Sequence, residues 1–127
     1  MAKQVNSIKI TLTLPPRELS PNWRGHWRTK RKAVKKYRQA AHLTAFLERD
    51  GRQSSWVRAT AQATFRYHVR RRRDKDNLLA MLKPAFDGVS DAGVILDDAG
   101  LTHLPVEIVT GVPKADERVE IVITKEP

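Results

Sequence analysis

The stretch that decides the fold is Val57–Val69, VRATAQATFRYHV, in which apolar and polar residues alternate. A period of two residues is typical of a β-strand that packs one face on a core and keeps the other face polar. We therefore predict a half-buried strand here. If the extended conformation continues beyond this strand, every second residue that follows also lies on the polar face. Those residues are Arg70, Arg72, Asp74 and Asp76.

The residues directly after this strand combine a run of cations with closely spaced carboxylates. The arginines of the run are Arg70, Arg71, Arg72 and Arg73. Asp74 and Asp76 follow, and a second acidic pair, Asp97-Asp98, lies beyond the next expected helix. A divalent metal ion next to a polyanion would account for both signs of charge, since short carboxylates are suitable ligands for a hard cation. The structural alternative to metal binding is that these aspartates cap helices or stabilise turns, although one cap accounts for only one aspartate of each pair.

The chain that follows indicates a kinked helix and two further strands. Residues from Asn77 to Ala92 have apolar positions at helical spacing, and Pro84 is expected to kink this helix because it has no N–H to donate. Gly93 is suited to end the helix. The expected strands are Leu101–Thr110 and Val119–Thr124.

The residues before the central strand indicate one strand and one basic helix. Ser7–Leu14 alternates and is ended by Pro15-Pro16, which cannot donate to a strand ladder. Thr29–Asp50 has helical spacing, with Asp50-Gly51 as its expected end. The start of this helix has many cations. Two explanations for them are open: contact with DNA, or an ordinary solvent-exposed helix face. These cations are Lys30, Arg31, Lys32, Lys35 and Lys36.

Taken in order, these elements predict an α+β fold of the order β-α-β-α-β-β, with a small mixed β-sheet and two main helices in a single domain, 1–127. The 127 residues carry a formal net charge of +10, which favours a phosphate-backbone partner. The sequence contains no cysteine, which excludes disulfides, a thiolate zinc site and a cysteine nucleophile. Since no membrane-length apolar run or signal-peptide pattern occurs, we expect a cytoplasmic protein.

Four motifs follow one another in a defined order and spacing. They are Asp74-x-Asp76-Asn77-Leu78, Lys83-Pro84-Ala85-Phe86-Asp87, Asp91-Ala92-Gly93 and Asp97-Asp98. Together with Pro15-Pro16 after the first strand and Asn22 downstream, they resemble the RusA-type Holliday junction resolvases, particularly the phage-borne branch. The resemblance extends over nearly the whole chain, and the expected order of elements agrees with a RusA-like fold.

The resemblance implies a homodimeric, Mg²⁺-dependent endodeoxyribonuclease, with Mn²⁺ as a substitute metal. It would resolve four-way DNA junctions by paired symmetric nicks during recombination and repair, in a bacterial or phage-infected cell. The catalytic and metal-binding aspartates would be Asp74, Asp76 and Asp98, with Asp97 as an adjacent contributor. The catalytic lysine would be Lys83. The arginine run and the cations of the first helix would contact flanking phosphates, with no membrane or small-molecule cofactor involved.

One departure from the family pattern concerns the lysine. Many members place it four residues after the second aspartate, whereas Lys83 lies seven residues after Asp76. At about 100° per residue, both spacings return to the same face of a continuous helix. Lys83 is therefore expected on the side of the helix that carries Asp76, nearly one turn farther along.

Two other functions remain open from the residues. One is a non-catalytic basic module that binds DNA or RNA and uses its aspartates only as caps and turns. The other is a metal-dependent nuclease for a different branched or flapped DNA.

Overall fold

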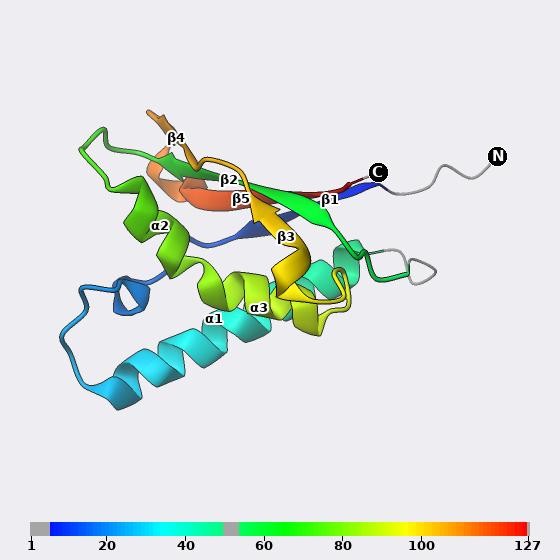
Figure 1. The fold of residues 1–127 in the computed structure, drawn as a ribbon. Helices are drawn as coiled ribbons and strands as arrows, with labels where there is room; N and C mark the ends of the chain where they lie inside the picture. The colour runs from blue at the N-terminus through cyan, green and yellow to red at the C-terminus, as the bar shows by residue number, and fades with distance from the viewer. Residues whose placement is uncertain (1–5, 50–53, 127) are drawn as a thin grey trace.

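The chain forms one five-stranded mixed sheet with its helices on one face (Figure 1). This computed structural model describes residues 6–49 and 54–126. The strands are β1 (Ser7–Leu12), β2 (Ala59–Tyr67), β3 (Leu101–His103), β4 (Glu107–Thr110) and β5 (Arg118–Lys125). The α-helices are α1 (Trp27–Glu48), α2 (Lys75–Met81) and α3 (Lys83–Asp91). Short 3-10 turns, η1 (Arg17–Leu19), η2 (Asp98–Gly100) and η3 (Lys114–Asp116), lie in the connections. The α+β class and the mixed sheet are therefore confirmed.

Strand β2 organises the sheet. It is antiparallel to β5, which is antiparallel to β1, and it is parallel to both β3 and β4. Its alternate side chains Ala59, Ala61, Ala63 and Phe65 are buried in the core, as the period of two predicted. Val57 and Val69 are outside the strand and exposed, so the predicted strand was too long at both ends.

The predicted strand Leu101–Thr110 is two short strands, β3 and β4. They pair with the two halves of β2, at Ala59–Ala61 and at Thr64–Tyr67. Pro105 lies between them and has no N–H for the ladder, which accounts for the interruption. The predicted order β-α-β-α-β-β therefore differs from the observed order here, because its third strand is divided.

The predicted kinked helix Asn77–Ala92 is likewise divided, into α2 and α3, with Leu82 between them. Pro84 occupies the first turn of α3, where the missing N–H costs no internal hydrogen bond. Continuing α2 through Pro84 would leave the Ala80 carbonyl unpaired and in contact with the proline ring. Gly93 follows α3 with a φ of 78°, which confirms its predicted role at the end of the helix.

Helices α1 and α3 pack closely against each other beneath the sheet (Figure 1). Gly88 permits this approach, because a Cβ there would lie 2.4 Å from the Arg38 carbonyl oxygen. The Arg38 guanidinium also donates two hydrogen bonds, of 2.7 and 2.8 Å, to Asp91. This pairing holds the pKa of Asp91 below its usual value. Asp91, a residue of one of the four motifs, therefore joins α3 to α1.

Helix α1 ends at Glu48, close to the predicted end. The predicted stop at Asp50-Gly51 lies outside the described residues. No helix in the described ranges is long and apolar enough to cross a membrane.

Candidate functional site

Asp74 and Asp76 lie at the start of α2, beyond the end of β2. Asp74 is the N-cap of this helix, and its Oδ1 accepts hydrogen bonds from the Asp76 N–H (2.9 Å) and the Asn77 N–H (3.3 Å). Asp76 belongs to the first helical turn, and both side chains are exposed. Carboxylates at a helix N-terminus also interact favourably with the helix dipole. Asp74 therefore has a structural role, and both carboxylates remain accessible from solvent.

The prediction that Arg70, Arg72, Asp74 and Asp76 extend the polar face of β2 is wrong. The strand ends at Tyr67, and Asp76 is helical. The residue after the strand, His68, has other partners: its N–H donates to Glu117 Oε2, and its ring Nδ1 lies 2.8 Å from the Val112 carbonyl oxygen. These contacts replace the strand ladder at this point, and the arginine run forms a connection instead.

The four arginines of this connection are not equivalent. Arg70, Arg71 and Arg72 are exposed. Arg73 is partly buried, with its guanidinium carbon 3.5 Å from the centre of the Tyr67 ring and its Nη2 donating to the Val69 carbonyl oxygen. Arg73 therefore fastens the connection to the end of β2. The other three arginines present their charges to solvent.

Asp97 and Asp98 lie in the turn before β3. Asp97 is the N-cap of η2, and its Oδ1 accepts a hydrogen bond of 3.0 Å from the Ala99 N–H. This bond, with a smaller contribution from Asp98, lowers the pKa of Asp97. Both side chains are exposed. As at Asp74, one member of the acidic pair caps a turn and its neighbour has no such role.

The two aspartate pairs lie at opposite ends of β2 in one chain. Leu101, just after η2, pairs with Ala59 at the start of β2, whereas Asp74 follows Tyr67 at its end. The nine residues of β2 span roughly 26 Å. Within the described residues, no group of three acidic or histidine side chains could hold a metal ion. The structure thus does not bring Asp74, Asp76 and the second pair together within one chain.

Lys83 is exposed and is the first residue of α3. The expectation that it shares a helix face with Asp76 is wrong, because α2 ends at Met81 and the two residues lie on different helices. The helical periodicity on which that expectation depended does not continue across Leu82.

The predicted cations of the first helix are on α1. Four of them, Arg31, Lys32, Lys35 and Lys36, are exposed. Lys30 is partly buried, and its ammonium lies 3.4 Å from the Ser20 carbonyl oxygen, which it can reach with a weak hydrogen bond. The N-terminal half of α1 therefore presents a dense positive surface that can contact phosphates.

A charged cluster on the sheet face opposite the helices was missed from the sequence. Glu120 is buried and pairs with Lys9 and Arg66, and Arg118 lies 3.7 Å away. The Lys9 and Arg66 side chains lower the pKa of Glu120 to about 2. These residues come from β1, β2 and β5, so the cluster depends on strand pairing that their separate sequences do not reveal.

No protein-family model matches the chain. A protein of Xylella fastidiosa (strain Temecula1 / ATCC 700964), named "Uncharacterized protein", is 36% identical over 113 residues. That similarity covers 83% of this chain and 69% of the Xylella protein.

Proposed function

The chain belongs to the same family as that Xylella fastidiosa protein, and we propose that it is a Mg²⁺-dependent endonuclease that resolves four-way DNA junctions as a homodimer. The observation that carries the proposal is the placement of two exposed aspartate pairs at opposite ends of β2, in a chain of net charge +10. The arginine run and the positive surface of α1 add the means of contacting phosphates.

Two copies are needed because one chain does not gather the donors. A two-fold axis places the same surface of each copy against the other, so that opposite ends of the two sheets can meet. The start of one β2 then lies near the end of the other. Each of two equivalent sites would combine Asp74 and Asp76 of one copy with Asp97 and Asp98 of the second copy.

Exposed apolar side chains next to both aspartate pairs support this arrangement. Leu96, which precedes Asp97, is 71% exposed, and Val57, at the same end of β2, is 67% exposed. Val69, at the other end, is 49% exposed. Burial of these exposed apolar side chains against a second chain would favour its association at both ends of β2.

The residues can be given roles in phosphodiester hydrolysis. Mg²⁺, when bound by the aspartates, supplies an activated water and neutralises charge on the phosphate oxygens. Arg70, Arg71 and Arg72 contact the phosphates that flank the cut, and they add affinity with little sequence choice. Lys83 is an exposed cation seven residues after Asp76, available to stabilise charge on the departing oxygen. A two-fold dimer would address two opposed strands of a nearly two-fold junction, which gives paired nicks.

The test is incubation of the protein with a labelled mobile four-way junction, with Mg²⁺ or with EDTA. We expect symmetric nicks that a DNA ligase can reseal, formed with Mg²⁺ and absent with EDTA. Unlabelled duplex and flap DNA are added as competitors, and the junction should compete best. Cleavage of the flap in preference to the junction would assign a different branched substrate. Binding without Mg²⁺-dependent cleavage of any DNA would contradict the proposal.

A non-catalytic nucleic-acid-binding module is the second candidate. It is favoured by the capping hydrogen bonds of Asp74 and Asp97, which give one member of each acidic pair a purely structural role. It does not account for Asp76, an exposed carboxylate that follows Lys75, or for Asp98, an exposed carboxylate beside Asp97. Cleavage by the wild-type protein, lost in an Asp74→Asn variant that still binds DNA, separates the two candidates.

A further inference from the structure

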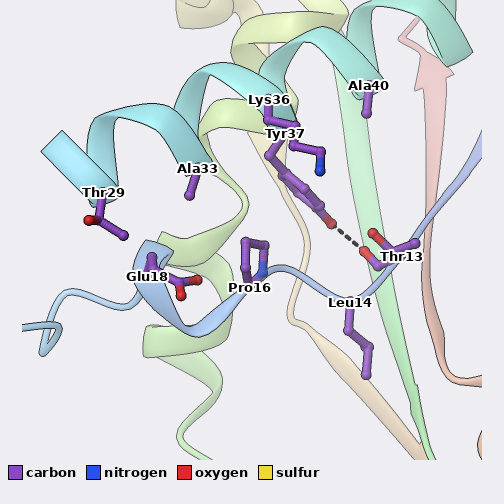
Figure 2. A pocket seen from close by; sticks show the side chains of 9 residues that line it. All are labelled: Thr13, Leu14, Pro16, Glu18, Thr29, Ala33, Lys36, Tyr37 and Ala40. Carbon is purple, nitrogen blue, oxygen red and sulfur yellow. Dashed lines mark hydrogen bonds between the residues drawn. The ribbon is translucent and has the colours of Figure 1, made fainter. Parts of the chain in front are cut away.

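A pocket of about 430 Å³ lies between the N-terminal half of α1 and the segment that joins β1 to this helix (Figure 2). This volume is within the range of small-ligand pockets, roughly 300–1,000 Å³. Leu14, Pro16 and Ala33 give it apolar walls. Tyr37 is buried, and its hydroxyl donates a 2.7 Å hydrogen bond to the Thr13 carbonyl oxygen, which fixes the pocket wall to the end of β1. One wall of the pocket is therefore held to the end of β1 by this hydrogen bond.

The polar side chains of the pocket are the carboxylate of Glu18, the amine of Lys36, and the hydroxyls of Thr13, Thr29 and Tyr37. Figure 2 shows the carboxylate of Glu18 near Pro16 and Thr29, and the amine of Lys36 farther along α1. The Glu18 side chain is 21% exposed, and its ion pair with Arg17, at 3.8 Å, is too long for a hydrogen bond. The carboxylate can therefore accept hydrogen bonds from a ligand in the pocket.

The surroundings of the pocket indicate the class of ligand. The positive surface of α1 continues outward from Lys36 to Lys32 and Lys35, both exposed. Such a surface suits phosphates, but Glu18 repels them. The pocket thus favours a flat apolar group with N–H donors, attached to phosphates that remain outside. An unpaired nucleobase has this combination of properties, and proteins read such bases through stacking surfaces and the Watson–Crick edge.

We propose that this pocket receives one unpaired base of bound DNA and prefers guanine. The inference rests on the DNA binding of the proposed function and adds a base preference to it. Guanine presents two adjacent donors, N1–H and N2–H₂, to which the Glu18 carboxylate can bind with both oxygens. Thymine presents one donor between two carbonyl oxygens, which repel the carboxylate. Adenine and cytosine present an amino group beside an acceptor nitrogen and are intermediate.

The test measures binding of duplexes that carry a single-nucleotide bulge, either guanine or thymine, by fluorescence anisotropy in EDTA. The wild-type protein should bind the guanine bulge about tenfold more tightly than the thymine bulge. Glu18→Gln should bring this ratio close to one. Glu48→Gln is the matched control, since it removes the same charge from an exposed position on α1 and should keep the ratio. Ala33→Leu narrows the pocket without changing its charge. It should lower the affinity for both bulged duplexes relative to the affinity for a fully paired duplex.

Equal affinity of the wild-type protein for the two bulges would overturn the inference, as would a ratio that Glu18→Gln preserves. Cleavage of junctions by the same preparation separates this outcome from the proposed function. If the protein cleaves junctions with Mg²⁺ but shows no guanine preference, only the proposed base recognition by the pocket is refuted. If it prefers guanine but cleaves no DNA, only the proposed nuclease activity is refuted. If it binds no DNA, both proposals are refuted.

Discussion

Asp74 combines a structural role with a proposed catalytic one. Its Oδ1 caps α2, so a change at this position can alter both stability and activity. Asparagine caps a helix about as well as aspartate, whereas alanine costs about 1 kcal/mol. The choice of substitution therefore separates the two roles.

We expect Asp74→Asn to reduce junction cleavage by about 100-fold or more, because the proposed metal ligand is lost, while the free energy of unfolding changes little. Asp74→Ala should lose cleavage equally and also lose about 1 kcal/mol of stability. Cleavage rates and urea denaturation measure the two effects. Asp116→Asn, at an exposed aspartate of η3, is the control. Undiminished cleavage by Asp74→Asn would leave this residue as a cap alone.

Glu120 is expected to stabilise the sheet in a pH-dependent manner. Its pKa falls from an ordinary value of 4.5 to about 2, because Lys9 and Arg66 donate to the carboxylate. Since the folded pKa lies below the unfolded one, the stabilisation is complete above about pH 4.5 and is lost as the pH falls toward 2.

Glu120→Gln should therefore lower the free energy of unfolding at pH 7 by about 1–3 kcal/mol. The lower part of this range is expected, because the Lys9 side chain is 58% exposed and solvent screens its charge. Urea denaturation across a pH series measures the difference, which should shrink as the pH approaches 2. A difference that is the same at pH 7 and at pH 2.5 would contradict the ionic origin of the stabilisation.

Single residues were predicted unevenly from the sequence. Gly93 was placed correctly, because a positive φ restricts where a residue can lie. Pro84 was predicted to kink one helix but lies in the first turn of a second helix, where its missing N–H costs no internal hydrogen bond. Glu18 attracted no prediction, since a single glutamate in an irregular segment has no pattern. Its environment is created by α1, which follows later in the chain.

In the connection between β2 and α2, the arginines have different structural roles. Arg71 is exposed, whereas Arg73 stacks on Tyr67 and donates to backbone carbonyl oxygens. One arginine is thus available to a phosphate, and the other maintains the shape of the connection. These two positions differ in structure although the sequence presents them as members of one run.

We expect Arg71→Ala to reduce the slope of log affinity against log salt concentration by about 0.9, the contribution of one phosphate contact. Arg73→Ala should instead lower the free energy of unfolding by about 0.5–2 kcal/mol, through the lost contact with the Tyr67 ring. Salt titrations of DNA binding and urea denaturation distinguish the two variants. Equal losses of affinity, with the free energy of unfolding unchanged in both variants, would contradict the different roles assigned to Arg71 and Arg73.

The elements themselves were predictable where one local pattern dominates. The period of two in β2 and the helical spacing of α1 both reflect a single buried face. The pattern did not show where β2 ends, because Glu117 and Val112, which bond to His68, come 49 and 44 residues later in the chain. Nor did it show that the residues around Pro105 divide an edge strand, since that depends on the pairing with β2.

At the scale of the whole molecule, the central result is the separation of the two aspartate pairs. The sequence suggested the pairs and their residue types, but not that the parallel register of β2 and β3 places them at opposite ends of the sheet. Register is determined by contacts between segments about 40 residues apart, which no local period encodes. The consequence is that a shared metal site requires a second copy of the chain.

The most direct test of this claim is complementation between two inactive variants. In a dimer of an Asp74→Asn chain and an Asp98→Asn chain, one composite site carries both substitutions and the other carries neither. We expect the mixed dimer to nick one strand of the four-way junction with Mg²⁺, although each variant alone is inactive. A mixture of Asp74→Asn and Asp76→Asn is the control, because both of its composite sites are defective. An inactive mixture of Asp74→Asn and Asp98→Asn, with mixed dimers demonstrated and the wild-type protein active, would contradict the shared site.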